Sequence, residues 1–157
     1  MTVDNKINKI KTYVSLISLT VFIVSLTQTA LTYNDFDGQK IHSSLSLLFM
    51  GGLAILGGGL LEWFIWLANP LYVLALIFFF KSNKTSRVVS IVATFLALSF
   101  TTWKDILAAE NGRTATIESL NLGYWLWVLS LTILSIGTIY YFRQLENNND
   151  DRKNHSI

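Results

Sequence analysis

The sequence contains no cysteine, a single proline and few charged residues. The absence of cysteine excludes disulfides, thiolate nucleophiles and cysteine-based metal sites. Charged residues make up only 14% of the 157 residues, whereas 52% are hydrophobic and the mean hydropathy is +0.45. Such a chain has too few polar side chains to cover a water-soluble domain. The composition therefore predicts that lipid surrounds most of the protein.

The sequence also offers little for metal, cofactor or nucleic-acid chemistry. His42 and His155 have no second ligand at metal-binding spacing. Asp35-Phe36-Asp37-Gly38 lacks the regular acidic spacing and the closing glutamate of a calcium loop, so we interpret it as a turn. We expect no metal and no other cofactor. The basic residues that produce the net charge of +2 are unevenly distributed, which indicates membrane orientation rather than a nucleic-acid partner.

Apolar runs long enough to cross a membrane recur along the chain. We expect spanning helices at about 12–32, 61–80, 87–104 and 122–142. The first run is longer than the apolar part of a secretory signal and lacks a small-x-small cleavage site, so we expect it to be retained. The fold class predicted is an all-α polytopic membrane helix bundle with four transmembrane helices, forming one domain over residues 1–145. The polar tail at 146–157 should be disordered.

The apolar region 43–80 is too long for one straight crossing, because at about 1.5 Å per residue it would extend on the order of 57 Å. Glycines between Gly51 and Gly59 weaken a helix there. We therefore expect an extra apolar helix at about 43–58, either re-entrant or interfacial, followed by a break and then the second span. Asn69-Pro70 would either kink that span or cap it.

The basic residues favour a single crossing by this region. That topology gathers nine of them on one side, and cytoplasmic loops are enriched in lysine and arginine: Lys6, Lys9, Lys11, Lys81, Lys84, Arg87, Arg143, Arg152 and Lys153. Only Lys40, Lys104 and Arg113 remain on the other side. Both termini should therefore be cytoplasmic. Aromatic residues agree, since the predicted outer boundary carries Tyr33, Phe36, Trp103, Tyr124, Trp125 and Trp127.

The segment from Glu62 to Pro70 is the first candidate contact site. A carboxylate beside an apolar run is costly unless it is paired, hydrated or protonated, which makes Glu62 a functional candidate. The alternative, which we prefer, places Glu62 in water at the outer interface, with Trp63 and Trp66 as anchors. Asn69 belongs to the same patch.

The loop from Lys104 to Asn121 is the second candidate, because it is the longest outer loop and carries both signs of charge. Arg113 facing Glu110, Glu118 or Glu62 would make an ion-pair network that binds a ligand, a lipid headgroup or a partner protein. The alternative is that these charges only cap the neighbouring helices, since surface ion pairs contribute little. Further contact candidates follow the loop: Tyr124 and Trp125.

Two aromatic segments carry a resemblance to known proteins. Trp66-Leu67-Ala68-Asn69-Pro70 and Gly123-Tyr124-Trp125-Leu126-Trp127 resemble segments of small, uncharacterised multi-helix membrane proteins of bacteria, in which a Trp-x-Ala-Asn-Pro stretch opens or kinks a helix. The resemblance implies a bacterial inner membrane and no known activity.

The function expected from these features is non-enzymatic, because the sequence shows no constellation of nucleophile, base and orienting residue. We expect protein or lipid contacts at the outer face, with the lipid bilayer and either a membrane protein or a second copy as partners. One alternative is a pore formed by oligomerisation through Gly51–Gly59. Another is a membrane enzyme that uses Glu62 and the Glu110, Arg113 and Glu118 cluster on a lipid-linked substrate.

Overall fold

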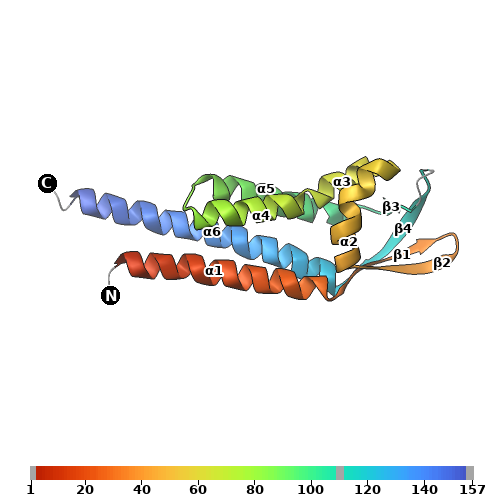
Figure 1. The fold of residues 1–157 in the computed structure, drawn as a ribbon, viewed down its shortest axis with the longest axis horizontal. Helices are drawn as coiled ribbons and strands as arrows, with labels where there is room; N and C mark the ends of the chain where they lie inside the picture. Colours follow the sequence, from red (N-terminus) through yellow and green to blue (C-terminus); the bar gives the residue numbers. More distant parts are fainter. Residues whose placement is uncertain (1–2, 109–111, 155–157) are drawn as a thin grey trace.

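The computed structural model describes residues 3–108 and 112–154, and the side chains of residues 8–108 and 112–148. Long helices lie side by side along most of the molecule, and a small sheet occupies one end (Figure 1). The elements in chain order are α1 (Val3–Leu26), β1 (Thr29–Asp35), β2 (Gly38–Ser43), α2 (Ser44–Met50), the 3-10 helix η1 (Gly51–Gly57), α3 (Leu60–Trp66), α4 (Ala68–Phe80), α5 (Thr85–Ser99), the 3-10 turn η2 (Phe100–Thr102), β3 (Asp105–Leu107), β4 (Thr114–Leu120) and α6 (Leu122–Asn154).

Four helical stretches are long and apolar enough to span a membrane, as the sequence predicted. They cover Asn8–Leu26, Leu60–Phe80, Thr85–Thr102 and Leu122–Asn148. The start of α1, the connection from α4 to α5 and the end of α6 lie toward one end of the molecule, and the sheet lies at the other (Figure 1). The chain therefore runs the length of the bundle four times.

The sheet shows that the all-α prediction was wrong in this part of the chain. Four antiparallel strands pair in the order β2-β1-β4-β3. Helix α1 ends at Leu26, so the last residues of the predicted span 12–32 belong to β1. In the sheet, Leu31 of β1 pairs with Leu120 of β4. No local sequence pattern reveals this partner, because the two strands are separated by most of the chain.

Helix α6 differs from the prediction at its C-terminal end. It continues to Asn154, so residues 146–154 are helical where a disordered tail was expected. Extending an existing helix needs no new nucleus, which explains why polar residues can continue it. Glu146 also attaches this part of α6 to α5, because its Oε1 accepts hydrogen bonds from Lys84 Nζ and Arg87 Nη2, both at 2.9 Å.

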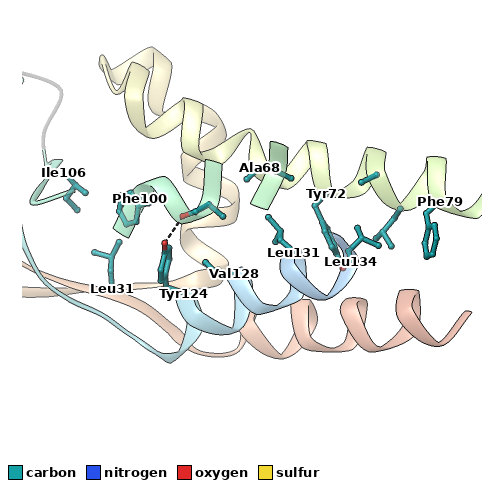
Figure 2. Packing of buried hydrophobic residues seen from close by; sticks show 14 of the residues in the cluster. Leu31, Ala68, Tyr72, Phe79, Phe100, Ile106, Tyr124, Val128, Leu131 and Leu134 are labelled. Atoms are coloured by element: carbon teal, nitrogen blue, oxygen red, sulfur yellow. Dashed lines mark hydrogen bonds between the residues drawn. The ribbon is translucent and has the colours of Figure 1, made fainter. Parts of the chain in front are cut away.

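Small residues and hydroxyl groups hold the bundle together. Gly137 of α6 packs directly against Val14 of α1, with no room for a Cβ atom. Ser18 Oγ donates to the Ser130 carbonyl at 2.8 Å and lies 2.8 Å from Tyr72 Oη, which connects α1, α4 and α6. Figure 2 shows Tyr72 directed toward this interior, beside Leu131 and Leu134. Several buried hydroxyls therefore find partners inside the bundle, although Ser15 Oγ and Ser86 Oγ have none within the described part of the chain.

Candidate functional site

A cavity of about 250 Å³ lies where the sheet meets the helices. Its walls come from β1, β2, the segment Ser44–Trp66 and the start of α6. We call Ser44–Trp66, which comprises α2, η1 and α3, the ledge. Apolar side chains form most of the wall, and Figure 2 shows four of them grouped at this junction: Leu31, Phe100, Ile106 and Tyr124.

The kink between α3 and α4 positions one side of this cavity. Pro70 has no backbone N–H, so the Trp66 carbonyl four residues earlier loses its helical donor. Asn69 Nδ2 replaces that donor with a hydrogen bond to the Trp66 carbonyl at 3.0 Å. Asn69 Oδ1 also accepts from Trp127 Nε1 at 2.9 Å. Of the two sequence interpretations of Asn69-Pro70, the structure supports a kink, and the kink is tied to α6.

Trp66 connects α3 to α2 and η1 within the ledge. Its Nε1 donates to the Leu48 carbonyl at 2.7 Å. Its ring covers two glycines, since a Cβ atom on Gly51 would lie 2.5 Å from Trp66 Cδ1 and one on Gly52 would lie 2.9 Å from Trp66 Cζ2. Gly58 then reverses the chain with a φ of +87°, a conformation that favours glycine. The glycine-rich stretch therefore packs against its own chain at Gly51 and Gly52.

Glu62 joins the ledge to the sheet. Its Oε1 accepts a hydrogen bond from the Leu107 backbone N–H of β3 at 2.7 Å, and its side chain is half-buried. Glu62 lines both the cavity and a neighbouring surface groove, which we call the outer groove. The outer groove also carries Trp103, Lys104 and Asp105. Glu62 is therefore neither a fully exposed interfacial residue nor an isolated intramembrane acid.

Ser44 and His42 are polar residues of the cavity, and the apolar wall around them offers few hydrogen-bond partners. Ser44 is 8% exposed, and its Oγ has no hydrogen-bond partner within the described part of the chain. The His42 ring stacks on Tyr33, with ring centroids 4.8 Å apart. Burial lowers the pKa of His42, which keeps the imidazole neutral at neutral pH. The cavity thus combines apolar surface with an unmet hydroxyl and a neutral ring.

An ion-pair cluster around Asp35 stabilises the surface of the sheet. Its carboxylate is 3% exposed and contacts Lys40 Nζ at 2.7 Å and Arg113 Nη2 at 3.1 Å. It also accepts from the Phe36 backbone N–H at 2.8 Å. The hydrogen bond from Lys40, followed by that from Phe36, lowers the pKa of Asp35. In return, Asp35 raises the pKa of Lys40. The expected turn at Asp35–Gly38 is the connection of the β1–β2 hairpin.

The structure distributes the other predicted contact residues over separate places. Arg113 pairs with Asp35 in β1, a partner the sequence did not suggest. Glu118 accepts a hydrogen bond from Asn34 Nδ2 at 2.7 Å and another from Gln39 Nε2. Glu110 lies outside the described residues. Among the described residues, Arg113 and Glu118 therefore belong to the sheet surface, whereas Glu62 contacts β3; the predicted contact between Glu110 and Arg113 stays a prediction.

The aromatic candidates also fall into different environments. Trp63 is half-buried, with its ring 5.6 Å from that of Phe64. Trp125 is 49% exposed and donates to the Leu120 carbonyl at 3.2 Å. Tyr124 is buried at the cavity wall and donates to the Ala97 carbonyl at 2.7 Å. Of the predicted residues that the structure describes, four line the cavity: Glu62, Trp66, Asn69 and Tyr124.

Sequence reasoning missed Ser44, because a lone serine in an apolar region gives no signal until its surroundings are known. It also missed Asp35 as a structural carboxylate, although Lys40 five residues later across a two-residue turn is a signal that a hairpin assignment uses. Within the described residues, no group of three His, Asp or Glu side chains is arranged to hold a metal ion. The arrangement is suited to binding: an apolar chamber, one free hydroxyl and a charged groove beside it.

No protein-family model, no curated protein and no solved structure matches this chain.

Proposed function

We propose that this chain is a non-enzymatic multi-pass membrane protein that acts at its outer face by holding an apolar segment of a membrane lipid. The observation that carries the proposal is the cavity of about 250 Å³ between the sheet and the ledge. In this proposal the start of α1 and the end of α6 face the cytoplasm and the sheet faces outward, in a bacterial inner membrane. The lysines and arginines at the end opposite the sheet support that orientation.

The ledge supports a lipid ligand because its outside is apolar as well. Large apolar side chains are exposed along it: Leu45, Phe49, Met50, Leu53, Leu56, Leu60 and Leu61. So many exposed apolar side chains within one short segment are unfavourable in water and are typical of helices that lie at a membrane boundary. Met50 is both 63% exposed and part of the cavity wall, so the cavity adjoins this apolar surface. An acyl chain would then enter from the bilayer without crossing water.

The size of the cavity is compatible with part of an acyl chain. An apolar cavity of about 150 Å³ is large enough to bind benzene. A cavity of about 250 Å³ therefore accommodates a longer apolar segment than a six-carbon ring. The wall holds few hydrogen-bonding groups that remain available, because Asn69 and Tyr124 already have partners. Hydrocarbon is the ligand chemistry that matches such a wall.

The proposal is tested by filling the cavity. Ala54 lines it, and Ala54→Phe places a ring in the space that the acyl chain would occupy. Leu53→Phe is the matched control, because Leu53 is the adjacent residue of η1, is 59% exposed and is absent from the cavity wall. Mild detergent extraction followed by native mass spectrometry should find bound lipid in the wild type and in Leu53→Phe. Ala54→Phe should lose at least ten-fold of that occupancy.

Two results would contradict the proposal. The first is a wild-type protein that carries no lipid after extraction, although it is folded by circular dichroism. The second is equal lipid retention by Ala54→Phe and the wild type, which would place the bound lipid elsewhere on the surface.

A further inference from the structure

The outer groove adjoins the cavity and differs from it in chemistry. Three residues line both: Glu62, Ile106 and Leu107. The groove adds Trp103, an aromatic side chain of the kind found at membrane interfaces, and the charged residues Lys104 and Asp105. A ligand whose apolar part occupies the cavity would therefore have its polar part beside these charges.

The charged groups of the groove can still form hydrogen bonds or ion pairs with a ligand. Glu62 uses Oε1 for the Leu107 N–H, and its Oε2 has no hydrogen-bond donor among the residues that the structure describes. Asp105 uses Oδ1 to accept from Thr116 Oγ1 at 2.9 Å and is exposed. Lys104 forms no ion pair with any described side chain. The groove thus offers two carboxylates and one ammonium group.

This charge set selects between lipid headgroups. With both carboxylates ionised, the three groups sum to a negative charge, which disfavours a headgroup whose net charge is also negative. A zwitterionic headgroup satisfies both signs, since its ammonium is attracted to Glu62 and Asp105 and its phosphate to Lys104. Because the groove is partly exposed, these contacts give selectivity more than affinity.

The unpartnered hydroxyl in the cavity adds a second requirement. Ser44 Oγ is buried in a chamber where bulk water does not compensate it, and a lost hydrogen bond there is costly. A pure hydrocarbon leaves this donor unsatisfied, whereas a carbonyl oxygen accepts from it. The ester carbonyl of a glycerolipid supplies such an acceptor next to an acyl chain.

We propose that the cavity and the outer groove together bind a zwitterionic aminophospholipid, with one acyl chain in the cavity, an ester carbonyl at Ser44, the ammonium at Glu62 and Asp105, and the phosphate at Lys104. This rests on the proposed function, because it assumes that the cavity holds a lipid chain. It goes beyond it by assigning the headgroup class and the residues that select it.

Headgroup selection is tested with lipids of identical chains. The purified protein is delipidated and then exchanged into mixed micelles that contain equal amounts of phosphatidylethanolamine and phosphatidylglycerol, and bound lipid is measured by native mass spectrometry. The wild type should retain phosphatidylethanolamine at least five-fold over phosphatidylglycerol. Glu62→Gln with Asp105→Asn should abolish or reverse this ratio. Gln preserves the acceptor for the Leu107 N–H, so the ledge stays attached to β3.

Glu118→Gln is the matched control, because Glu118 is a carboxylate on the sheet that does not line the groove. It should keep the wild-type ratio. Equal retention of the two lipids by the wild type would overturn the headgroup assignment and leave the cavity proposal intact. Retention of neither lipid would overturn both.

The hydroxyl is tested with the linkage of the chain. The wild type should bind diester phosphatidylethanolamine about three-fold better than its diether analogue, which lacks the carbonyl. Ser44→Ala should bind the two equally. An identical ester preference in Ser44→Ala and the wild type would overturn the role of Ser44.

Discussion

The helical bundle and the sheet-bearing end use different interactions to satisfy their polar groups. In the interior of the bundle, most neutral hydroxyls pair with each other or with carbonyl groups, as Ser90 does with Thr138 at 3.1 Å and Thr94 with Ser135 at 2.8 Å. The ion pairs that join α5 and α6 lie at the end of the bundle opposite the sheet. At the sheet end, charged side chains enclose Asp35. Charge is costly where water is absent, whereas neutral hydroxyl pairs are not. The comparison indicates that neutral hydrogen bonds hold the interior of the bundle and ion pairs hold the sheet end, and the cavity lies where the two regions meet.

The largest effect should come from crowding the bundle. Gly137→Leu forces a side chain against Val14, whose β-branched side chain has little rotamer freedom in a helix. We expect a loss of about 3 kcal/mol in the free energy of unfolding, since overpacking a tight contact costs this much. Unfolding in detergent, followed by circular dichroism, measures it. The control Ile136→Leu alters a neighbouring side chain that is 63% exposed, and it should change stability by less than about 0.5 kcal/mol.

Equal stability of the Gly137 and Ile136 variants would contradict the proposed difference between the two regions, because the bundle would then not depend on close packing of α1 against α6. A loss of stability in the Gly137 variant alone would support that difference. The sheet does not take part in the Gly137–Val14 contact, so it should keep its amide protection until the bundle unfolds.

The two regions also differ in how far the sequence predicts them. The number of spans follows from the lengths and composition of the apolar runs, which the bundle preserves in four helical stretches. The sheet was missed because β1 and β4 pair across most of the chain, and β3 is only Asp105–Leu107. Short strands between long apolar helices look like loops when each is examined alone.

The candidate site could be predicted only in part, because some of its residues reach it through the same long-range strand pairing. Glu62, Trp66, Asn69 and Tyr124 attracted attention as polar or aromatic residues beside apolar runs, and all four line the cavity. Ser44 and His42 reach the cavity only because β2 folds back along β1 and delivers α2 to the start of α6. Arg113 pairs with Asp35, which the sequence did not suggest, because its position depends on the β1–β4 pairing; the predicted contact of Arg113 with Glu110 lies outside the described residues.

An intermediate effect is expected at the junction of the two regions. Asn69→Leu leaves the Trp66 carbonyl and Trp127 Nε1 without their partners. We expect a loss of about 2 kcal/mol, the cost of orphaning buried polar groups, measured by the same unfolding assay. Adding Pro70→Ala supplies a backbone N–H for the Trp66 carbonyl and should recover part of the loss. If the double variant is no more stable than Asn69→Leu, the kink is not what Asn69 supports.

The smallest and most local effect is expected at the sheet end. Asp35→Asn keeps an acceptor for the Phe36 N–H but removes the charge that attracts Lys40 and Arg113. Amide hydrogen exchange in β1 and β2 should rise a few-fold, while exchange in the bundle and the unfolding midpoint stay unchanged, because local opening need not involve the whole fold. Asp37→Asn is the control, since Asp37 is exposed and lies 3.5 Å from Lys40.

The acid dependence of this local stability follows from the pKa of Asp35, which folding lowers. A carboxyl whose pKa is lower in the folded than in the unfolded chain stabilises the fold fully above its unfolded pKa, and the stabilisation is lost as the pH falls through the lowered value. The wild type and Asp35→Asn should therefore differ in hairpin exchange at neutral pH and converge below the ordinary carboxyl range, after correction for intrinsic exchange rates. A difference that persists in strong acid would mean that Asn disturbs the hairpin by shape, and the sheet end would then depend on packing as the bundle does.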